Sequence, residues 1–397
     1  MKIDLFEMER TQCLYESTVD FNLSESGVLP LTVDELLQGS VEKERFLGHR
    51  LSYCESDGSL LLRERIAQFY PDCRAGNITV VNGGAEAIYV TLWTLLGKDG
   101  RLACMVPNYM QGWGIGRAYA DGVDTFSLEP RHGKDGSRWA LDADSFQRAV
   151  SARTNVILVT NPNNPTGAVL NEEEMKIILD AARKVGAWLI VDEIYRGAEV
   201  DSDAITPTFW GRYEKVIVTS GLSKAFGLPG LRIGWVVAPR DVIEQVWMRH
   251  DYLTLTPGLL NDRLASIALE PARRQKILER TRGIIRTNLT AVEAWIGRYA
   301  DLLKFIRPKA GAIAYFQYDF DYNSVQLFED LRKEYSVLVT PADHFGATKG
   351  LRIGFGYDLQ KTLRGLARLG SFLEACRDRG ASTRVTREAT TRAMADN

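Results

Sequence analysis

The sequence predicts an α/β protein in which a large domain, built on a doubly wound and mostly parallel sheet, is joined to a smaller α+β domain. The main observation is that short β-branched runs alternate with helical stretches between residues 78 and 219, a pattern typical of parallel strands with helical crossovers. After Pro239 the pattern becomes mostly helical and ends in short alternating segments. A length of 397 residues also exceeds one typical hydrophobic core.

The elements of the large domain follow from local periodicity. The spacing of Leu61, Ile66 and Phe69 predicts a helix over 58–70. Predicted strands then alternate with predicted helices: strand 78–81, helix 85–96, strand 102–106, helix 145–151, strand 156–160, helix 172–185, strand 188–191 and strand 216–219. In sheets of this kind the loops at the carboxyl ends of the strands form the ligand crevice.

The second half predicts a linking helix and a smaller domain. A helix over 241–250 precedes a longer one over 273–299, which is long enough to bridge two domains; strands at 312–318 and 337–339 and helices at 325–335 and 359–377 follow. We divide the chain into an N-terminal arm with the start of the small domain (1–50), a large domain (51–270), the linking helix with the small domain (271–379) and a tail (380–397). The first thirty residues are expected to form a lid or arm. The tail lacks apolar periodicity and is expected to be disordered.

Composition limits the partners. A net charge of -2 and an isoelectric point near 6.2 give no broad basic field, so nucleic acid and anionic membranes are not expected as partners, and a small-molecule ligand is. The five cysteines and four histidines are dispersed, so no metal site or disulfide framework is expected. The amino terminus is too acidic for a secretory signal and no apolar stretch approaches membrane-spanning length, so we expect a cytoplasmic protein.

The stretch from Thr219 to Gly234 sets one lysine, Lys224, in a loop of small residues after a predicted strand. Ser223 precedes the lysine, and Arg232 lies beyond a Gly-Leu-Pro-Gly turn. A hydroxyl and two cations in one loop suit a phosphate, and a lysine that is desolvated or beside another cation has a lowered pKa and becomes a nucleophilic amine. The alternative is that Lys224 is a solvated loop lysine. The neighbouring motifs decide between these two interpretations.

Two further motifs follow predicted strands. In Asn161-Pro-Asn-Asn-Pro-Thr-Gly167 the two Asn-Pro steps force an irregular backbone, which presents the Asn164 amide at the sheet edge. In Val191-Asp-Glu-Ile-Tyr-Arg196 the strand ends at Asp192, and Tyr195 follows a turn later. The Asp192 carboxylate could cap a helix or hold a protonated ring nitrogen.

In this order and spacing the motifs resemble the class I/II aminotransferase superfamily, pyridoxal-phosphate (PLP) enzymes of fold type I, over roughly residues 53–356. The resemblance implies that Lys224 holds PLP as a Schiff base and moves a proton, and that Asp192 pairs with the pyridinium nitrogen, which keeps the ring an electron sink. Asn164 and Tyr195 would hydrogen-bond the phenolic oxygen, and Tyr109 would stack on the ring or else be a core tyrosine. A helix N-terminus favours an anion, and the phosphate would be held by Ser223, Arg232 and the backbone amides of Gly84 and Ala85.

The same resemblance implies a homodimer and a carboxylate-binding residue. Tyr53 matches a tyrosine that reaches the phosphate of the neighbouring subunit, so the active sites would be shared. Arg352 matches the arginine that binds the substrate α-carboxylate, a role that suits its bidentate fork. Two departures leave substrate and reaction open: Gly221 stands where many members have a second phosphate-binding serine, and Pro341-Ala-Asp-His-Phe345 replaces a usual Pro-Gly-Ser/Thr turn.

Three stretches resemble a narrower group, the PLP-dependent cyclases that make cyclic guanidino amino acids of the capreomycidine and enduracididine type. These are residues 23–28, the Lys224 loop and residues 250–255. In this comparison Glu9 falls at an acidic position of the arm, so Glu9 and Gly27 are expected at the substrate; Glu9 could instead be a solvated charge. The implied reaction of natural-product biosynthesis is loss of a hydroxyl from a hydroxylated L-arginine and ring closure in a site shielded from water.

Other functions use the same residues. An aminotransferase, which moves an amino group between an amino acid and a 2-oxo acid, would need the same Lys224, Asp192 and Arg352. An oxygen-using arginine oxidase is a variant of this chemistry. A ligand-sensing domain of a transcription regulator is disfavoured, because the mostly acidic or neutral residues before Tyr53 leave no room for a DNA-binding module.

Overall fold

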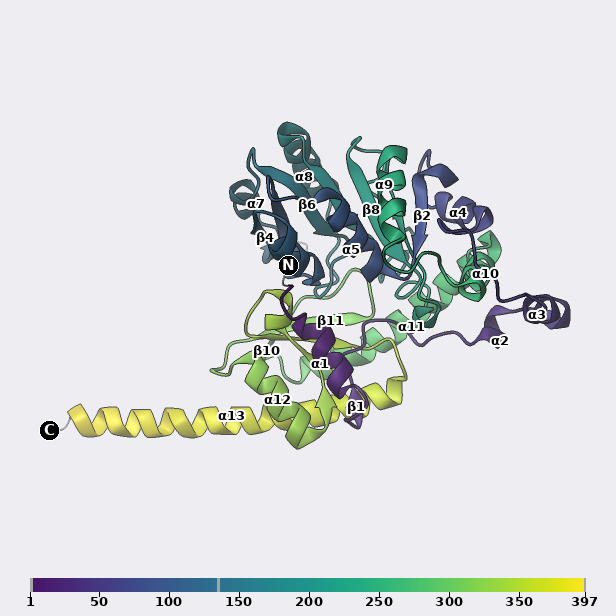
Figure 1. Cartoon of the computed structure of the whole chain (residues 1–397). Coiled ribbons are helices and arrows are strands. Elements are labelled where there is room, and N and C mark those ends of the chain that lie inside the picture. The colour runs from purple at the N-terminus through teal and green to yellow at the C-terminus, as the bar shows by residue number, and fades with distance from the viewer. Residues whose placement is uncertain (1–2, 134–135, 396–397) are drawn as a thin grey trace.

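The computed structural model describes residues 3–133 and 136–395, with side chains up to residue 377, and shows a larger and a smaller domain joined by a long helix (Figure 1). Within these residues the larger domain is built on an eight-stranded sheet. In spatial order its strands are β2 (Ile78–Val81), β9 (Gly234–Val237), β8 (Val216–Gly221), β7 (Trp188–Asp192), β6 (Thr154–Thr160), β3 (Arg101–Val106), β4 (Gly122–Gly133) and β5 (Gly136–Leu141).

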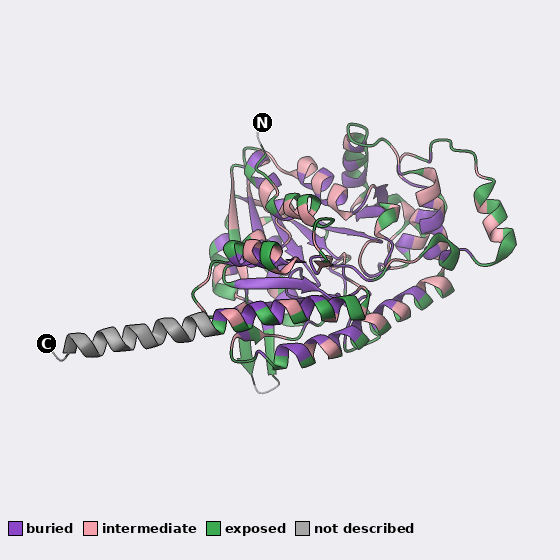
Figure 2. Ribbon diagram, turned by 90° about the horizontal axis from the view of Figure 1, so that it is seen from below, coloured by how far each residue is buried: buried purple, intermediate pink, exposed green. Residues whose placement is uncertain are grey.

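The centre of this sheet is parallel and fully covered. Strands β8, β7, β6, β3 and β4 pair in parallel, whereas β9, β2 and β5 pair antiparallel to their neighbours. Successive apolar residues of β6 enter different cores: Ile157 and Val159 belong to one cluster, Val156 and Leu158 to the other. Two apolar faces need a layer of helices on each side, and Figure 2 shows the strands buried between them. The predicted α/β class is therefore confirmed.

Local signals define the helices of this domain. The clearest case is α8, where Asn171 and Glu174 form a capping box and Gly186 ends the helix at φ +70°. The helices of the large domain are α4 (Leu60–Ala67), α5 (Gly84–Leu95), α6 (Gln111–Tyr119), α7 (Ala143–Ala149), α8 (Glu172–Val185), α9 (Arg240–His250) and α10 (Leu259–Ala268).

The smaller domain begins with the linking helix α11 (Pro271–Gly297). Along α11, Ile277, Ile285 and Val292 form part of a buried stripe, which explains its length despite a polar outer face. The domain continues with an antiparallel sheet ordered β10 (Leu303–Phe305), β11 (Ile313–Tyr318), β14 (Gly350–Gly354) and β13 (Thr340–Pro341). Its helices are α12 (Ser324–Tyr335), the short η3 (Ala342–Phe345) and α13 (Leu359–Ala395).

The N-terminal arm, residues 3–32, packs on the smaller domain. It contains α1 (Glu7–Tyr15) and β1 (Phe21–Asn22), which pairs in parallel with β12 (Val337–Leu338). Beyond β1, the Gly354 N–H donates to Leu23 O at 2.7 Å and the Leu29 N–H donates to Gly356 O at 2.8 Å. The chain then forms α2 (Val33–Leu36) and α3 (Gly39–Leu47), which stand out from the large domain in Figure 1.

Several elements differ from the sequence prediction. Helix α6 was missed because Gly112 and Gly116 lower helix propensity; a Cβ at these positions would lie 2.2 Å from Leu158 and 2.5 Å from Leu102, so the glycines let α6 approach the sheet closely. The β4–β5 hairpin and the short β9 were also missed. In α4, Leu62 is buried while Leu61 is exposed.

The last helix, α13, is described to Ala395 along its backbone. The expectation of a disordered tail over 380–397 stays a prediction. Residues 396–397 and the side chains from 378 onward lie outside the described part of the chain. Among the helices of that part, none is both long and apolar enough to cross a membrane.

The close approach of the arm to β14 gives a first testable prediction. A Cβ at Gly354 would lie 1.4 Å from Glu25 O, so Gly354→Ala should displace the arm and lower stability by about 1–3 kcal/mol, the usual cost of overpacking. We expect faster proteolysis of residues 16–30 and a lower Tm. Gly76→Ala is the matched control, since nothing lies within 4 Å of its Cβ. Equal behaviour of the two variants would contradict the close packing of the arm.

Candidate active site

A cavity of about 750 Å³ lies where the carboxyl ends of β6, β7 and β8 meet the N-terminal arm. The pairing of Thr160 with Asp192 and of Asp192 with Thr219 brings the three loops to one edge of the sheet. Ten of the predicted site residues line the cavity: Glu9, Gly84, Ala85, Tyr109, Asn164, Asp192, Tyr195, Ser223, Lys224 and Arg232.

Lys224 lines this cavity and contacts the arm. Its Nζ donates to Ser26 Oγ at 2.8 Å. Ser26 is buried, and it comes from a segment that sequence reasoning placed only in a general lid. The arm therefore reaches the amine directly.

The first turn of α5 and Arg232 form an anion site. Gly83 has φ +96°, and a Cβ there would lie 2.4 Å from Arg232 Nη2, so only glycine lets the guanidinium approach this turn. Arg232 itself adopts the left-handed conformation at φ +47°. The N-terminus of a twelve-residue helix and a guanidinium both attract phosphate, and Ser223 adds a hydroxyl on the same cavity wall.

Residues 250–255, one of the stretches singled out in the sequence, contact the residues at the start of α5. His250 is buried, with Nε2 2.9 Å from Thr254 Oγ1 and 3.3 Å from Glu86 Oε1. The backbone N–H of Asn82 donates to Glu86 Oε2 at 2.8 Å, and the Asn82 side-chain amide donates to Thr254 Oγ1 at 2.6 Å. These bonds hold the start of α5, so the motif contacts the site only through this turn.

Asp192 and Tyr195 are buried polar groups aimed at the same cavity. Burial raises the pKa of Asp192 to about 7, opposed by a hydrogen bond from the Ile194 N–H at 3.2 Å and by the charge of Lys224, and reinforced by the charge of Glu193. The Tyr195 hydroxyl is buried with no hydrogen-bond partner among the described residues. A ring that offers a cationic nitrogen and a phenolic oxygen would satisfy both groups, so the site fits PLP.

Glu9 is half-buried and bonded to a site residue. The Tyr109 hydroxyl donates to Glu9 Oε1 at 2.9 Å, and Phe6 packs edge-on against the Tyr109 ring with centroids 4.9 Å apart. Burial raises the pKa of Tyr109 well above its usual value, and the charge of Glu9 adds to the shift. Helix α1 therefore covers the ring that sequence reasoning placed at the cofactor.

Three predicted residues do not line the cavity. Arg352 is buried behind it: its guanidinium donates to Asn164 Oδ1 at 3.1 Å, to Thr340 Oγ1 at 3.0 Å and to Ser24 O. Gly27 is buried, and a Cβ there would lie 3.3 Å from Ser223 O, which explains a small residue at this position. Tyr53 is 84% exposed and lies away from the cavity.

Sequence reasoning missed several arm residues that line the cavity, among them Gln12, Glu16, Glu25 and Ser26. The available signal was the polar residues at 22 and 24–26, in a segment predicted to form a lid or arm. Because the arm returns to the site only through its pairing with β14 and β12, local periodicity could not place these side chains.

Comparison with known proteins agrees with this geometry. Residues 21–369 match the family model "aminotransferase class I and II". Capreomycidine synthase of Streptomyces vinaceus is 28% identical over 362 residues, which cover 89% of each chain.

Solved structures share the fold. A PLP-dependent aminotransferase of Streptococcus suis has a TM-score of 0.86 and 28% identity, over 94% of this chain and 99% of that one. The PLP-dependent cyclase OrfR has a TM-score of 0.82 and 24% identity, over 94% of this chain and 98% of that one, and shows the fold alone. The match to the family model covers most of the sequence, and the chain belongs to the class I and II aminotransferase family, whose cofactor is pyridoxal 5'-phosphate.

Proposed function

We propose that the chain uses PLP through the residues that line the cavity. Lys224 Nζ would hold the cofactor covalently in the resting enzyme and, once the substrate amine has displaced it, would move the substrate α-proton. Asp192 would hold the ring nitrogen, and Tyr195 and Asn164 would hold the phenolic oxygen. The bound cofactor supplies an electron sink for the charge left at the α-carbon. The phosphate is assigned to the anion site made by Ser223, Arg232, Gly84 and Ala85.

The substrate in this proposal is an amino acid with a cationic side chain. The observation that carries it is the set of three carboxylates that the arm presents to the cavity, from Glu9, Glu16 and Glu25. Because Lys224 and Arg232 are assigned to the cofactor, these acids face the substrate, and a guanidinium matches them in charge and in hydrogen-bonding geometry. Arg352 is assigned to the substrate α-carboxylate. This carboxylate would replace Ser24 O and Asn164 Oδ1 as the acceptor of the guanidinium hydrogen bonds.

The reaction we propose is cyclisation of a hydroxylated L-arginine. After Lys224 Nζ takes the α-proton, the substrate hydroxyl leaves with this proton as water. A guanidine nitrogen then bonds to the carbon that carried the hydroxyl, and the proton that this nitrogen loses returns to the α-carbon through Lys224. The net change is loss of one water, so no oxidant is needed. Two features support this reaction: the relative named capreomycidine synthase spans 89% of both chains, and the arm forms one wall of the cavity, which helps to hold a folded substrate away from water.

Transamination is the second candidate. It is favoured by the Streptococcus suis aminotransferase, which is 28% identical over almost the whole chain. The proposed roles of Lys224, Asp192 and Arg352 serve both reactions equally, and fold alone does not choose between them.

The experiment that separates these functions uses the PLP-loaded enzyme and no 2-oxo acid. Arginine, 3-hydroxyarginine and 4-hydroxyarginine are each added, and products are identified by mass. Loss of one water from a hydroxyarginine, with the absorption of the cofactor restored, is the result expected for a cyclase. A 2-oxo acid with conversion of the cofactor to its pyridoxamine form would instead identify a transaminase, and consumption of oxygen would identify an oxidase.

Glu9 gives a prediction about specificity. Glu9→Gln keeps an acceptor for Tyr109 but removes the charge, so KM for the guanidino substrate should rise about ten-fold, since hydrogen bonds to charged groups contribute roughly 1.5–3 kcal/mol. The absorption of bound PLP should not change. Glu7→Gln is the control, because Glu7 lies on the same helix but lines a different cavity. A KM for Glu9→Gln equal to that of the control would argue against recognition by Glu9.

Asp192 gives a prediction about pH. Burial raises its pKa to about 7, above the value of about 3.9 in an unfolded chain, so between these values the folded cofactor-free protein binds more protons than the unfolded protein. Stability therefore falls as pH rises from about 4 to about 7. Asp192→Asn removes this effect, and its gain in unfolding free energy over the wild type should grow by on the order of 2 kcal/mol between pH 5 and pH 8. Urea unfolding of both cofactor-free proteins measures it; a pH-independent difference would contradict it.

Homodimerisation completes the proposed site. Several large apolar side chains are exposed in the single chain, among them Leu47, Leu51, Tyr53, Met248 and Tyr252. Side chains of this kind are candidates for burial against a second copy. Tyr53 would then reach the phosphate of its partner.

Mixed dimers test the shared site. Tyr53→Ala and Lys224→Ala subunits, each of low activity alone, are unfolded together and refolded as a mixture. In a mixed dimer one site carries both changes and the other carries neither, so activity should return. No recovery in dimers that demonstrably contain both subunits would overturn the shared site.

A further inference from the structure

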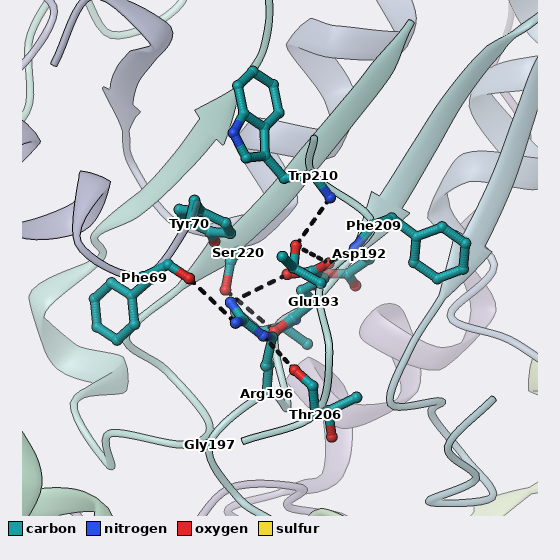
Figure 3. Close-up of polar contacts among 12 residues, drawn as sticks. Phe69, Tyr70, Asp192, Glu193, Arg196, Gly197, Thr206, Phe209, Trp210 and Ser220 are labelled. Carbon is teal, nitrogen blue, oxygen red and sulfur yellow. Dashed lines mark hydrogen bonds and ion pairs between the residues drawn. The ribbon is translucent and has the colours of Figure 1, made fainter. Parts of the chain in front are cut away.

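The turn that carries Asp192 and Tyr195 is held from behind by a buried ion pair (Figure 3). Asp192 and Tyr195 line the cavity. Glu193 and Arg196, one position further along in each case, lie on the other side of the turn, with Arg196 Nη1 3.5 Å from Glu193 Oε2. The Glu193 side chain is 1% exposed and the Arg196 side chain is 13% exposed.

Each member of the pair is tied to other segments. Glu193 Oε1 accepts from the Thr208 hydroxyl at 2.7 Å and from the Phe209 N–H at 3.0 Å. Arg196 donates through Nε to Thr206 O at 2.7 Å and through Nη2 to Phe69 O at 3.2 Å. The pair therefore joins the end of β7 to the loop over 206–209 and to the segment that follows α4.

We propose that the Glu193–Arg196 pair is a clamp that positions Asp192 and Tyr195 for the cofactor. Neither clamp residue lines the cavity, so both act through the turn. The Glu193 N–H donates to Thr219 O at 2.8 Å and the Arg196 N–H donates to Glu193 O at 3.0 Å. These bonds join the backbone of Glu193 to that of Arg196 and to β8. A shift of the clamp therefore shifts Asp192 and Tyr195 together.

The clamp also sets the charge next to Asp192. Asp192 has a neighbouring carboxylate in Glu193 and a nearby ammonium in Lys224, and the Glu193 charge raises its pKa. Arg196 offsets part of the Glu193 charge within the clamp, and Arg212 contributes from further away. A buried pair that loses one partner leaves an uncompensated charge, which is more disruptive than losing both.

The test uses the PLP-loaded dimer and three variants: Glu193→Gln, Arg196→Met and the double variant. Each single change should raise the cofactor Kd about ten-fold, in the range of measured couplings between contacting residues, and should change the visible circular dichroism of bound PLP. Because the two residues act as a pair, the double variant should change both measurements by less than the sum of the two single changes. The circular dichroism reports the orientation of the ring, which a merely structural role would not alter.

Glu174→Gln is the matched control. Glu174 is also buried, pairs with Arg138 at 2.9 Å and accepts the Leu141 N–H at 2.9 Å, but it lies on α8. It should lower Tm without changing the Kd or the dichroism. If Glu193→Gln affects the cofactor no more than Glu174→Gln does, the clamp is overturned.

The proposal rests on the cofactor roles of Asp192 and Tyr195, and Asp192→Asn separates the two failures. A cofactor unaffected by Asp192→Asn would overturn those roles and the clamp together. Sensitivity to Asp192→Asn without sensitivity to Glu193→Gln or Arg196→Met would overturn the clamp alone. Neither result depends on which reaction the enzyme catalyses.

Discussion

The active site depends on the packing of the N-terminal arm against β14. Leu23 O and Leu29 N are bonded to the backbone of Gly354 and Gly356, and a Cβ at either glycine would overlap the arm, 1.4 Å from Glu25 O or 2.2 Å from Gly27 O. Because the arm lies so close to the strand, residues 24–28 have little room to move. This packing places the Ser26 hydroxyl within hydrogen-bonding distance of Lys224 Nζ.

The cavity is electrostatically divided. On the side of the sheet lie an ammonium, a guanidinium and a helix N-terminus, which suit an anionic cofactor. On the side of the arm lie the carboxylates of Glu9, Glu16 and Glu25. The first side is built on the core of the large domain, where every residue of β7 and β8 except Trp188 is buried. The second side is built on the arm, outside that core, so under the proposed assignment changes in substrate specificity are expected there.

The sequence predicted the first side of the cavity well and the second side poorly. Asn164, Asp192 and Lys224 follow successive apolar runs, and parallel strands bring their carboxyl ends to one edge, so local patterns were enough. The contact of Ser26 with Lys224 joins residues 198 positions apart. It depends on Gly354, at the end of β14, and on Gly356 just beyond it, and the need for glycine at these positions appears only in three dimensions. Arg352 was predicted at the substrate α-carboxylate, but it does not line the cavity, and its bond to Asn164 was not predictable from spacing.

The same arrangement sets the order in which the two ends of the cavity can form during synthesis. The arm is made before the large domain, whereas its partners β12 and β14 are made only after it. Domains generally fold as units while the chain emerges, so the large domain can form the cofactor end of the cavity while the arm is still unpaired. The carboxylate end is completed last, once residue 356 has left the ribosome. During this interval a nascent chain has the residues that we assign to the cofactor but lacks the wall that we assign to the substrate.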